Sequence, residues 1–190
     1  TPKQLYVKQY RPVPGIGLLQ GSHFSEELRG NLLITNAIGF QGVAQYRFAN
    51  AGATFHVEPV EPILFSKDPN FRPTGVRIGG DGALYIPDWQ NPLIGHLQHN
   101  LRDPNRDHKH GRVYRVTYEG RELRKPVHMR GMNTEQVVSQ LTSPEDDLRY
   151  RARLELTGRP VEEATAAAAK LAASLDANDP ASGQALAETL

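Results

Sequence analysis

Apolar residues between positions 15 and 118 come in short runs that Gly, Pro and Asn interrupt, a rhythm typical of strands and turns. The runs predict antiparallel strands at 15–21, 31–37, 43–48 and 54–65, then at 74–78, 83–89, 112–118 and 122–127. Glycine-containing turns at 49–52, 79–82 and 118–121 join neighbouring strands, because glycine accepts the positive φ of a tight turn. Pro59 and Pro62 favour a sheet edge for the long strand 54–65.

Two successive four-stranded antiparallel units are typical of neighbouring β-propeller blades. The prediction is therefore a mainly β fold with a C-terminal α region: a partial β-propeller of about two blades plus HEAT-like helices. A single meander with one insertion is the alternative for the β part. Two blades leave sheet edges and an apolar face open, so we expect the remaining propeller blades, from the same parent chain or another chain, as the partner. The first residue, Thr1, also favours an internal piece or a processed product.

A helical rhythm begins after Val127, which divides the chain into predicted domains 1–127 and 128–190. Ser143 as N-cap and Pro144 as first helical residue predict a helix that ends at Gly158. An alanine-rich helix follows over 160–175, and a further helix begins at Asp179 and Pro180. The expected apolar face of the alanine-rich helix consists of Ala164, Ala168, Leu171 and Leu175. These helices suit either the first units of an α-solenoid or a helical cap on the sheet domain.

Composition narrows the function classes. The 190 residues carry 22 Lys and Arg against 21 Asp and Glu, a balance that argues against a nucleic acid partner. The charge is uneven, with 16 basic and 11 acidic residues before position 128 and 6 basic and 10 acidic residues from there on. No Cys is present, which excludes a disulfide, a thiolate zinc site, a cysteine nucleophile and covalent haem attachment in this chain. We also expect no membrane span, since no apolar run approaches the ~18 residues that one needs.

Blade topology predicts that three loops, at 38–41, 67–73 and 90–111, share one end of the sheets. The loop at 90–111 is much longer than the usual connection of ~4 to 6 residues and holds four of the seven His. Guanidinium and imidazole groups there suit an anionic or polyhydroxylated ligand. The residues predicted to form this catalytic face are Arg72, Asp88, His96, Arg102, His108 and His110. For Asp88, a channel-facing acid and the polar end of a strand are equally open.

A metal site is a further hypothesis for the long loop. His108 and His110 lie on the same side of an extended segment, and Asp103 and Asp107 are close in sequence. Calcium or another metal would suit these four residues. The alternatives are His side chains bonded to loop carbonyls and an aspartate turn, because an EF-hand would need Gly where His108 stands. Pairing of Arg102 with Asp103, holding the loop against Trp89, is the structural alternative for those residues.

Basic residues in and after the seventh predicted strand alternate with apolar ones, which favours a solvated strand face over a nucleic acid surface. They are Arg112, Arg115, Arg121, Arg124 and Lys125.

Several ordered blocks carry a family resemblance. The blocks are SHF at 22–24, NAIGFQG at 36–42, DPNFRP at 68–73, GDGALYI at 80–86, DWQNPLIGH at 88–96 and LRDPNRDHKHGR at 101–112. With them, residues 13–127 resemble the closing blades of the membrane-bound dehydrogenase domain proteins common in planctomycetes, the PVC-type haem-binding propeller family. The helices resemble the HEAT-like repeats that follow this propeller.

The resemblance implies a periplasmic or extracellular oxidoreductase, related in fold to soluble quinoprotein sugar dehydrogenases. It implies a sugar or alcohol dehydrogenase that passes electrons to a quinone or to a c-type haem, held in the parent protein or in a partner cytochrome c domain. This chain departs from the pattern, because it lacks the C-x-x-C-H haem motif and the earlier blades that hold the catalytic base. The family's dehydrogenase label rests largely on fold. The alternative function is a non-catalytic propeller and helical-repeat module that binds proteins or glycans.

Overall fold

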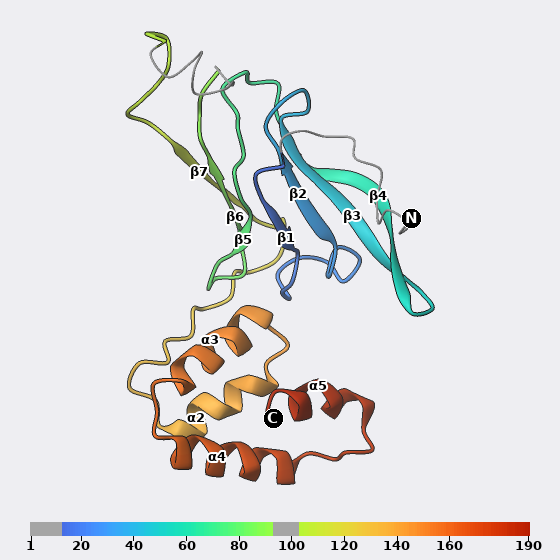
Figure 1. Ribbon diagram of the computed structural model, residues 1–190, viewed down its shortest axis with the longest axis vertical. Helices are drawn as coiled ribbons and strands as arrows, with labels where there is room; N and C mark the ends of the chain where they lie inside the picture. The colour runs from blue at the N-terminus through green and yellow to red at the C-terminus, as the bar shows by residue number, and fades with distance from the viewer. Residues whose placement is uncertain (1–12, 93–102) are drawn as a thin grey trace. The chain divides into compact units, whose positions relative to one another are not determined.

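The computed structural model describes residues 13–92 and 103–190 and divides into two compact units, Thr1–Leu123 and Arg124–Leu190 (Figure 1). The first unit is built from antiparallel sheets and the second from helices. A mainly β region followed by an α region is therefore confirmed. The described residues do not close into a barrel or a propeller, and the two-blade interpretation stays a prediction. So does the domain boundary at 127, since the compact units meet at Leu123 and Arg124.

The first sheet contains four antiparallel strands in the order β1-β2-β3-β4. Their bounds are β1 Ile16–Leu18, β2 Leu32–Asn36, β3 Gly42–Ala51 and β4 Thr54–Phe65. The turn between β3 and β4 lies further along the chain than the predicted 49–52, because Ala51 still pairs with Thr54. Gly52 has a φ of 66° there, a conformation that glycine adopts without strain. All four predicted strand positions are confirmed.

The second sheet contains three antiparallel strands in the order β5-β6-β7. They are β5 Arg77–Ile78, β6 Leu84–Asp88 and β7 Arg112–Val116. The eighth predicted strand, at 122–127, is wrong. A turn does follow β7, with Gly120 at a φ of 79°, but the chain after it is held elsewhere: Arg121 Nη1 donates to the carbonyls of Ser22 and Phe24, and the carbonyl of Glu122 lies 3.2 Å from His23 Nδ1.

One apolar core lies between the two sheets. Its buried residues are Leu19, Phe24, Leu33, Val43, Val76, Leu84 and Ile86. At the β1 and β5 side the backbones approach closely, since a Cβ added to Gly15 would lie 2.7 Å from the Cα of Gly75. Larger side chains, among them Leu64 and Tyr114, pack against the core from β4 and β7. Small residues beside β1 and β5 and large ones on the outer strands make the space between the sheets a wedge.

The first sheet is also apolar on the face that points away from the second sheet. Its centre is a second buried cluster of Leu32, Ile34, Ala44, Tyr46 and Val57. Alternation along the paired strands places Ile16, Leu18, Phe55 and Phe65 on this same face. These four rim residues remain 42–61% exposed. We call this surface the far face of the first sheet.

The helical unit is built from short α-helices joined by 3₁₀ turns. Its elements are α2 Thr134–Ser139, η1 Gln140–Thr142, α3 Asp146–Leu156, α4 Val161–Ser174, η2 Pro180–Ser182 and α5 Gly183–Ala187. The core consists mainly of Val137, Val138, Leu141, Leu148 and Ala152. The predicted helices over 160–175 and from about position 180 are confirmed. On α4 the most buried side chain is Ala167, between the expected Ala164 and Ala168.

Helix starts differ from the prediction. Ser143 is not an N-cap and Pro144 is not the first helical residue, because α3 begins at Asp146 with Glu145 as its N-cap. The Ser143 hydroxyl instead accepts a hydrogen bond from the main-chain N–H of Glu145. A capping box starts α2, where the side chain of Asn133 accepts from the N–H of Gln136 and the Gln136 side chain accepts from the N–H of Asn133.

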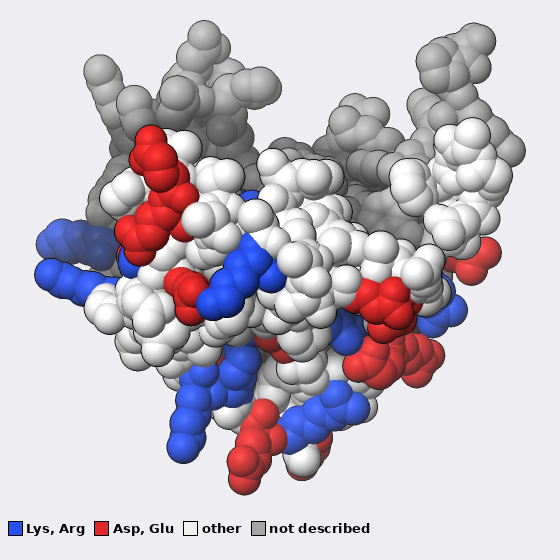
Figure 2. All heavy atoms as spheres, turned by 90° about the horizontal axis from the view of Figure 1, so that it is seen from below, with Lys and Arg blue, Asp and Glu red and all other residues white. Residues whose placement is uncertain are grey.

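Acidic and basic side chains are interspersed on the surface of the helical unit seen in Figure 2. Several are paired, including Arg124 with Asp147 and Arg149 with Asp146, each at 2.8 Å. Within residues 13–92 and 103–190, no helix has the length and hydropathy required to cross a bilayer.

Candidate functional site

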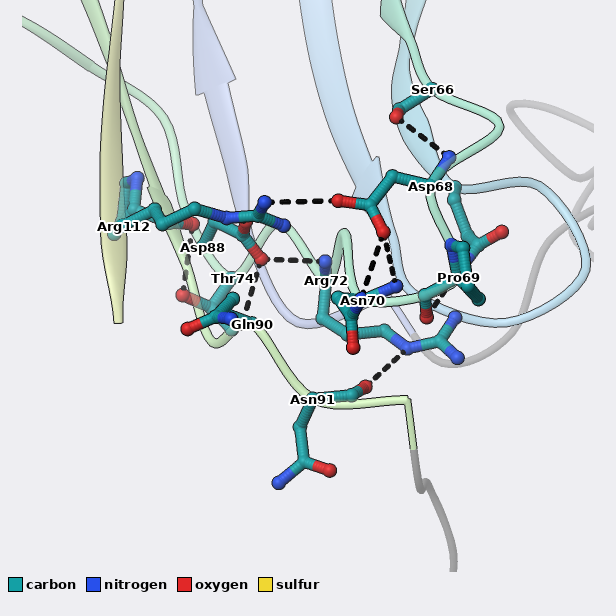
Figure 3. A network of polar contacts seen from close by, with 12 residues as sticks. Ser66, Asp68, Pro69, Asn70, Arg72, Thr74, Asp88, Gln90, Asn91 and Arg112 are labelled. Carbon is teal, nitrogen blue, oxygen red and sulfur yellow. Dashed lines mark hydrogen bonds and ion pairs between the residues drawn. The ribbon is translucent and has the colours of Figure 1, made fainter. Parts of the chain in front are cut away.

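Asp88 is the centre of a polar network at the end of β6 (Figure 3). Its carboxylate is fully buried. Oδ1 accepts from the main-chain N–H of Arg72 at 2.6 Å and from that of Gln90 at 2.8 Å, while Oδ2 accepts from Nε of Arg112 at 2.7 Å. Three donors, one of them a cation, satisfy this buried charge. The sequence leaves open whether Asp88 is a channel-facing acid or the polar end of a strand, and these contacts match the second role.

Arg72 joins the three loops that the sequence predicts to meet. Its side chain is almost completely buried. Nε donates to the carbonyl of Asn91 at 2.9 Å, Nη1 to that of Ala37 at 2.6 Å, and Nη2 to that of Pro92 at 3.1 Å. Burial lowers the pKa of Arg72, and the nearby carboxylates of Asp88 and Asp68 act in the opposite direction. Each guanidinium nitrogen thus holds backbone from the loop after β2 or after β6.

Arg112 connects the start of β7 to two carboxylates. It donates from Nη1 to Asp68 at 2.9 Å in addition to its bond with Asp88. Desolvation alone would lower the pKa of Arg112, but the hydrogen bonds to Asp68 and Asp88 outweigh it and raise that pKa. The N–H of Asn70 and the guanidinium of Arg112 lower the pKa of Asp68. Arg112 therefore belongs to a paired network rather than to the solvated strand face that the sequence suggested.

Asp103 and Asp107 each organise a turn in the described part of the long loop. Oδ1 of Asp103 accepts from the N–H of Asn105 at 2.9 Å. Oδ1 of Asp107 accepts from the N–H of Lys109 at 2.9 Å, and its Oδ2 lies 2.9 Å from Nδ1 of His110. The N–H of Lys109 is the main cause that lowers the pKa of Asp107, ahead of the bonds with His110. These contacts match the aspartate-turn alternative for both residues.

The predicted metal ligands do not come together as a set. Among residues 13–92 and 103–190, no three His, Asp or Glu side chains are grouped to hold a metal ion. His110 meets Asp107, whereas His108 is exposed. A calcium ion or another metal at this loop therefore stays a prediction.

Trp89 and Gln90 begin the long loop in a fixed conformation. The N–H of Trp89 donates to the carbonyl of Arg72 at 2.9 Å, and the guanidinium of Arg106 lies 4.9 Å from the centre of the indole ring. Gln90 has a φ of 54°, which is uncommon for a residue other than glycine. The bond from its N–H to Asp88 holds this backbone in place.

Two of the predicted catalytic residues, His96 and Arg102, lie outside the described residues, and so does the predicted pairing of Arg102 with Asp103. Arg72 and Asp88 lie together, with the main-chain N–H of one on the carboxylate of the other. Asp68 and Asn91 also belong to the network, which the sequence does not predict. Asp68 had a usable signal, since an Asp-Pro-Asn turn lies directly before Phe71 and Arg72.

Comparison with known protein families gives a match over most of the sheet unit. A family described as a domain of unknown function (DUF7133) matches residues 4–120. Neither the curated proteins nor the solved structures contain a match. The matched span contains both sheets and the polar network around Asp88.

Proposed function

Because the chain belongs to the DUF7133 family, whose description names no activity, we propose a function from the sheets and the site. The sheet unit forms two neighbouring blades of a larger β-propeller. This propeller is a periplasmic or extracellular oxidoreductase that acts on a sugar or another alcohol. The catalytic base and the electron acceptor, a quinone or a c-type haem, belong to other parts of the parent protein or to a partner.

The packing of the sheets supports the blade assignment. Two antiparallel sheets pack face to face, and the contact narrows toward β1 and β5, where Gly15 lies against Gly75. A wedge of this kind repeated around an axis produces a ring of sheets. The far face of the first sheet, with Phe55 and Phe65 exposed at its rim, offers an apolar surface for a preceding blade.

The single observation that carries the site is the contact of Arg72 with backbone from two other loops. Its bonds to Ala37, Asn91 and Pro92 fix three loops at one end of the stacked sheets. Exposed His108 and His110 lie in the long loop that this network anchors. A rigid scaffold that presents polar loop residues is the usual arrangement of a binding or catalytic surface.

The roles of the residues follow from their contacts. Arg72, Asp88 and Arg112 position the loops, because each of these side chains bonds to other groups within the protein. His110, held by Asp107, can form a hydrogen bond with a hydroxyl group of a bound sugar or alcohol, and Lys109 in the same loop supplies positive charge. The helical unit continues as HEAT-like repeats.

A non-catalytic module that binds proteins or glycans is the second candidate. The observation that favours it is that the side chains of Arg72 and Asp88 are bonded within the protein. Arg72 donates to the carbonyl of Asn91, and Asp88 accepts from the N–H of Gln90 and from Arg112, so neither side chain is directed to solvent.

Absorption spectroscopy and activity of the full-length native protein separate these candidates. We expect haem or quinone bands and sugar-dependent reduction of an artificial electron acceptor. Replacing His108 and His110 with Ala should lower kcat/KM at unchanged Tm, while His56→Ala, at an exposed position on the β3–β4 hairpin, should change neither. A colourless, inactive protein that still binds glycans or a protein partner would overturn the oxidoreductase assignment.

A further inference from the structure

The outer edge of β7 differs from the outer edge of the first sheet. β7 pairs with β6 on one side, and no other described strand lies on its second side. The first sheet has a fourth strand, β4, in the corresponding position. The two sheets pack around one core, but the second sheet has one strand fewer than the first.

The register shows which backbone groups this edge presents. Val113 lies opposite Pro87, which has no N–H, and the carbonyl of Pro87 accepts instead from Thr74 on the β5 side. Because antiparallel partners alternate between bonded and non-bonded pairs, Tyr114 bonds to β6. The N–H and C=O groups of Val113 and Arg115 therefore point outward from the sheet.

The β7 edge also lacks the features that protect β4. Pro59 and Pro62 interrupt the donors of β4, and its pairing with β3 has a register shift. β7 has the sequence Arg-Val-Tyr-Arg-Val, with no proline or bulge. Such an edge is a template for strand addition.

The segment that follows β7 does not fill this edge. Arg121 and Glu122 are bonded to residues 22–24, and the carbonyl of Val127 accepts from Arg151 in the helical unit. A strand at 122–127 is thereby excluded in this structure.

We propose that β7 accepts an extended strand from the remaining β region of the same protein, which completes the second sheet. This inference rests on the proposed propeller. We expect the incoming strand to carry apolar residues at alternate positions. Tyr114 and Val116 pack against the core but are only partly buried, whereas in the first sheet the outer strand β4 adds apolar side chains to the same core. A second copy of β7 is disfavoured, since antiparallel pairing would bring two Arg115 side chains to diagonal positions on one face.

Residue-resolved hydrogen exchange of the full-length native protein tests the strand. The amides of Val113 and Arg115 should exchange at least about tenfold more slowly than unprotected amides, which corresponds to about 1.4 kcal/mol. The amide of Tyr114, which β6 holds, is the internal control. Unprotected Val113 and Arg115 beside a protected Tyr114 would overturn the proposal, and protection that depends on protein concentration would assign the edge to a second copy and overturn it too.

A substitution and a labelling arm make the outcome specific. Val113→Pro removes the outward N–H without removing a bond to β6, so it should lower Tm, whereas Val113→Ala keeps the N–H and should lower Tm less. Equal effects of the two variants would contradict strand addition. Oxidative labelling of Phe55 and Phe65 tests the propeller separately. If these rings are protected from labelling but the amides of Val113 and Arg115 exchange freely, the added strand alone is rejected. If the rings are labelled, the proposed stacking of a further sheet on the first sheet is rejected.

Discussion

Polar contacts reach further along the sequence within the sheet unit than within the helical unit. In the sheet unit, His23 Nε2 accepts from the N–H of Tyr118 at 2.9 Å, across 95 positions, and Arg121 donates to the carbonyl of Phe24 across 97. In the helical unit, Asn133 and Gln136 cap α2 three residues apart, and the contact of Arg149 with Glu188 spans 39 positions. The sheet unit therefore depends on a few long-range polar contacts, which makes it sensitive to single changes at those positions.

Asp88→Ala should have the largest effect. It leaves Nε of Arg112 and two main-chain N–H groups without their carboxylate, which costs about 3 kcal/mol or more. Denaturation followed by the fluorescence of Trp89, the single Trp, measures the loss in the sheet unit. Glu135→Ala removes an exposed pair with Lys170 in the helical unit and is the control, with little change expected in the helical circular dichroism transition. Equal losses of stability in the two variants would contradict the difference between the units.

Gly15→Ala should destabilise the sheet unit by about 2 kcal/mol, because the new Cβ would lie 2.7 Å from Gly75 Cα and force β1 and β5 apart. Gly183→Ala in α5 meets no atom within 4 Å and should stabilise the helical unit by up to about 1 kcal/mol. The free energy of unfolding, measured with denaturant, tests both. A tolerated Gly15→Ala would mean that the sheets are not wedged at this point.

Asn133→Ala should destabilise the helical unit by about 1 kcal/mol, since it removes the capping box of α2. Ser143→Ala loses one hydrogen bond to the N–H of Glu145 and should cost less. Thermal unfolding followed by far-ultraviolet circular dichroism compares them. A larger loss for Ser143→Ala would restore Ser143 as the main helix cap.

The pH dependence should be the smallest effect and should differ between the units. The pKa of Asp68 is lowered by the N–H of Asn70 and by Arg112, and the pKa of Asp107 by the N–H of Lys109. Because these folded pKa values lie below the usual 3.8, their stabilisation is present above pH 3.8 and is lost as pH falls through the folded values. In the helical unit, Glu135 raises the pKa of Lys170, so that contribution is present below pH 10.5 and is lost as pH rises through the raised value. Unfolding midpoints across pH check both directions.

Most strands and helices can be predicted from local sequence patterns, because their formation depends on nearby residues. Apolar and polar residues alternate along β6, and glycine-containing turns follow β5 and β3. The strand predicted at 122–127 is wrong because contacts to His23 and to Ser22, 99 positions away, hold that segment. Contacts between residues far apart in sequence are also missed at the site. The sequence identifies Arg72 and Asp88 as polar residues at loop ends, but it does not show that Arg72 bonds to the carbonyl of Ala37 or that Asp88 bonds to Arg112. Ser143 is not a cap because its hydroxyl contacts the N–H two residues on, before α3 begins.

Electron cryomicroscopy of the full-length native protein tests the stacking of the sheets most directly. We expect a further antiparallel sheet against the far face of the first sheet, over Ile16, Phe55 and Phe65, and a ring of such sheets with the loops around Arg72 at one end. A far face that is open to solvent, or covered by helices instead of a sheet, would contradict the propeller.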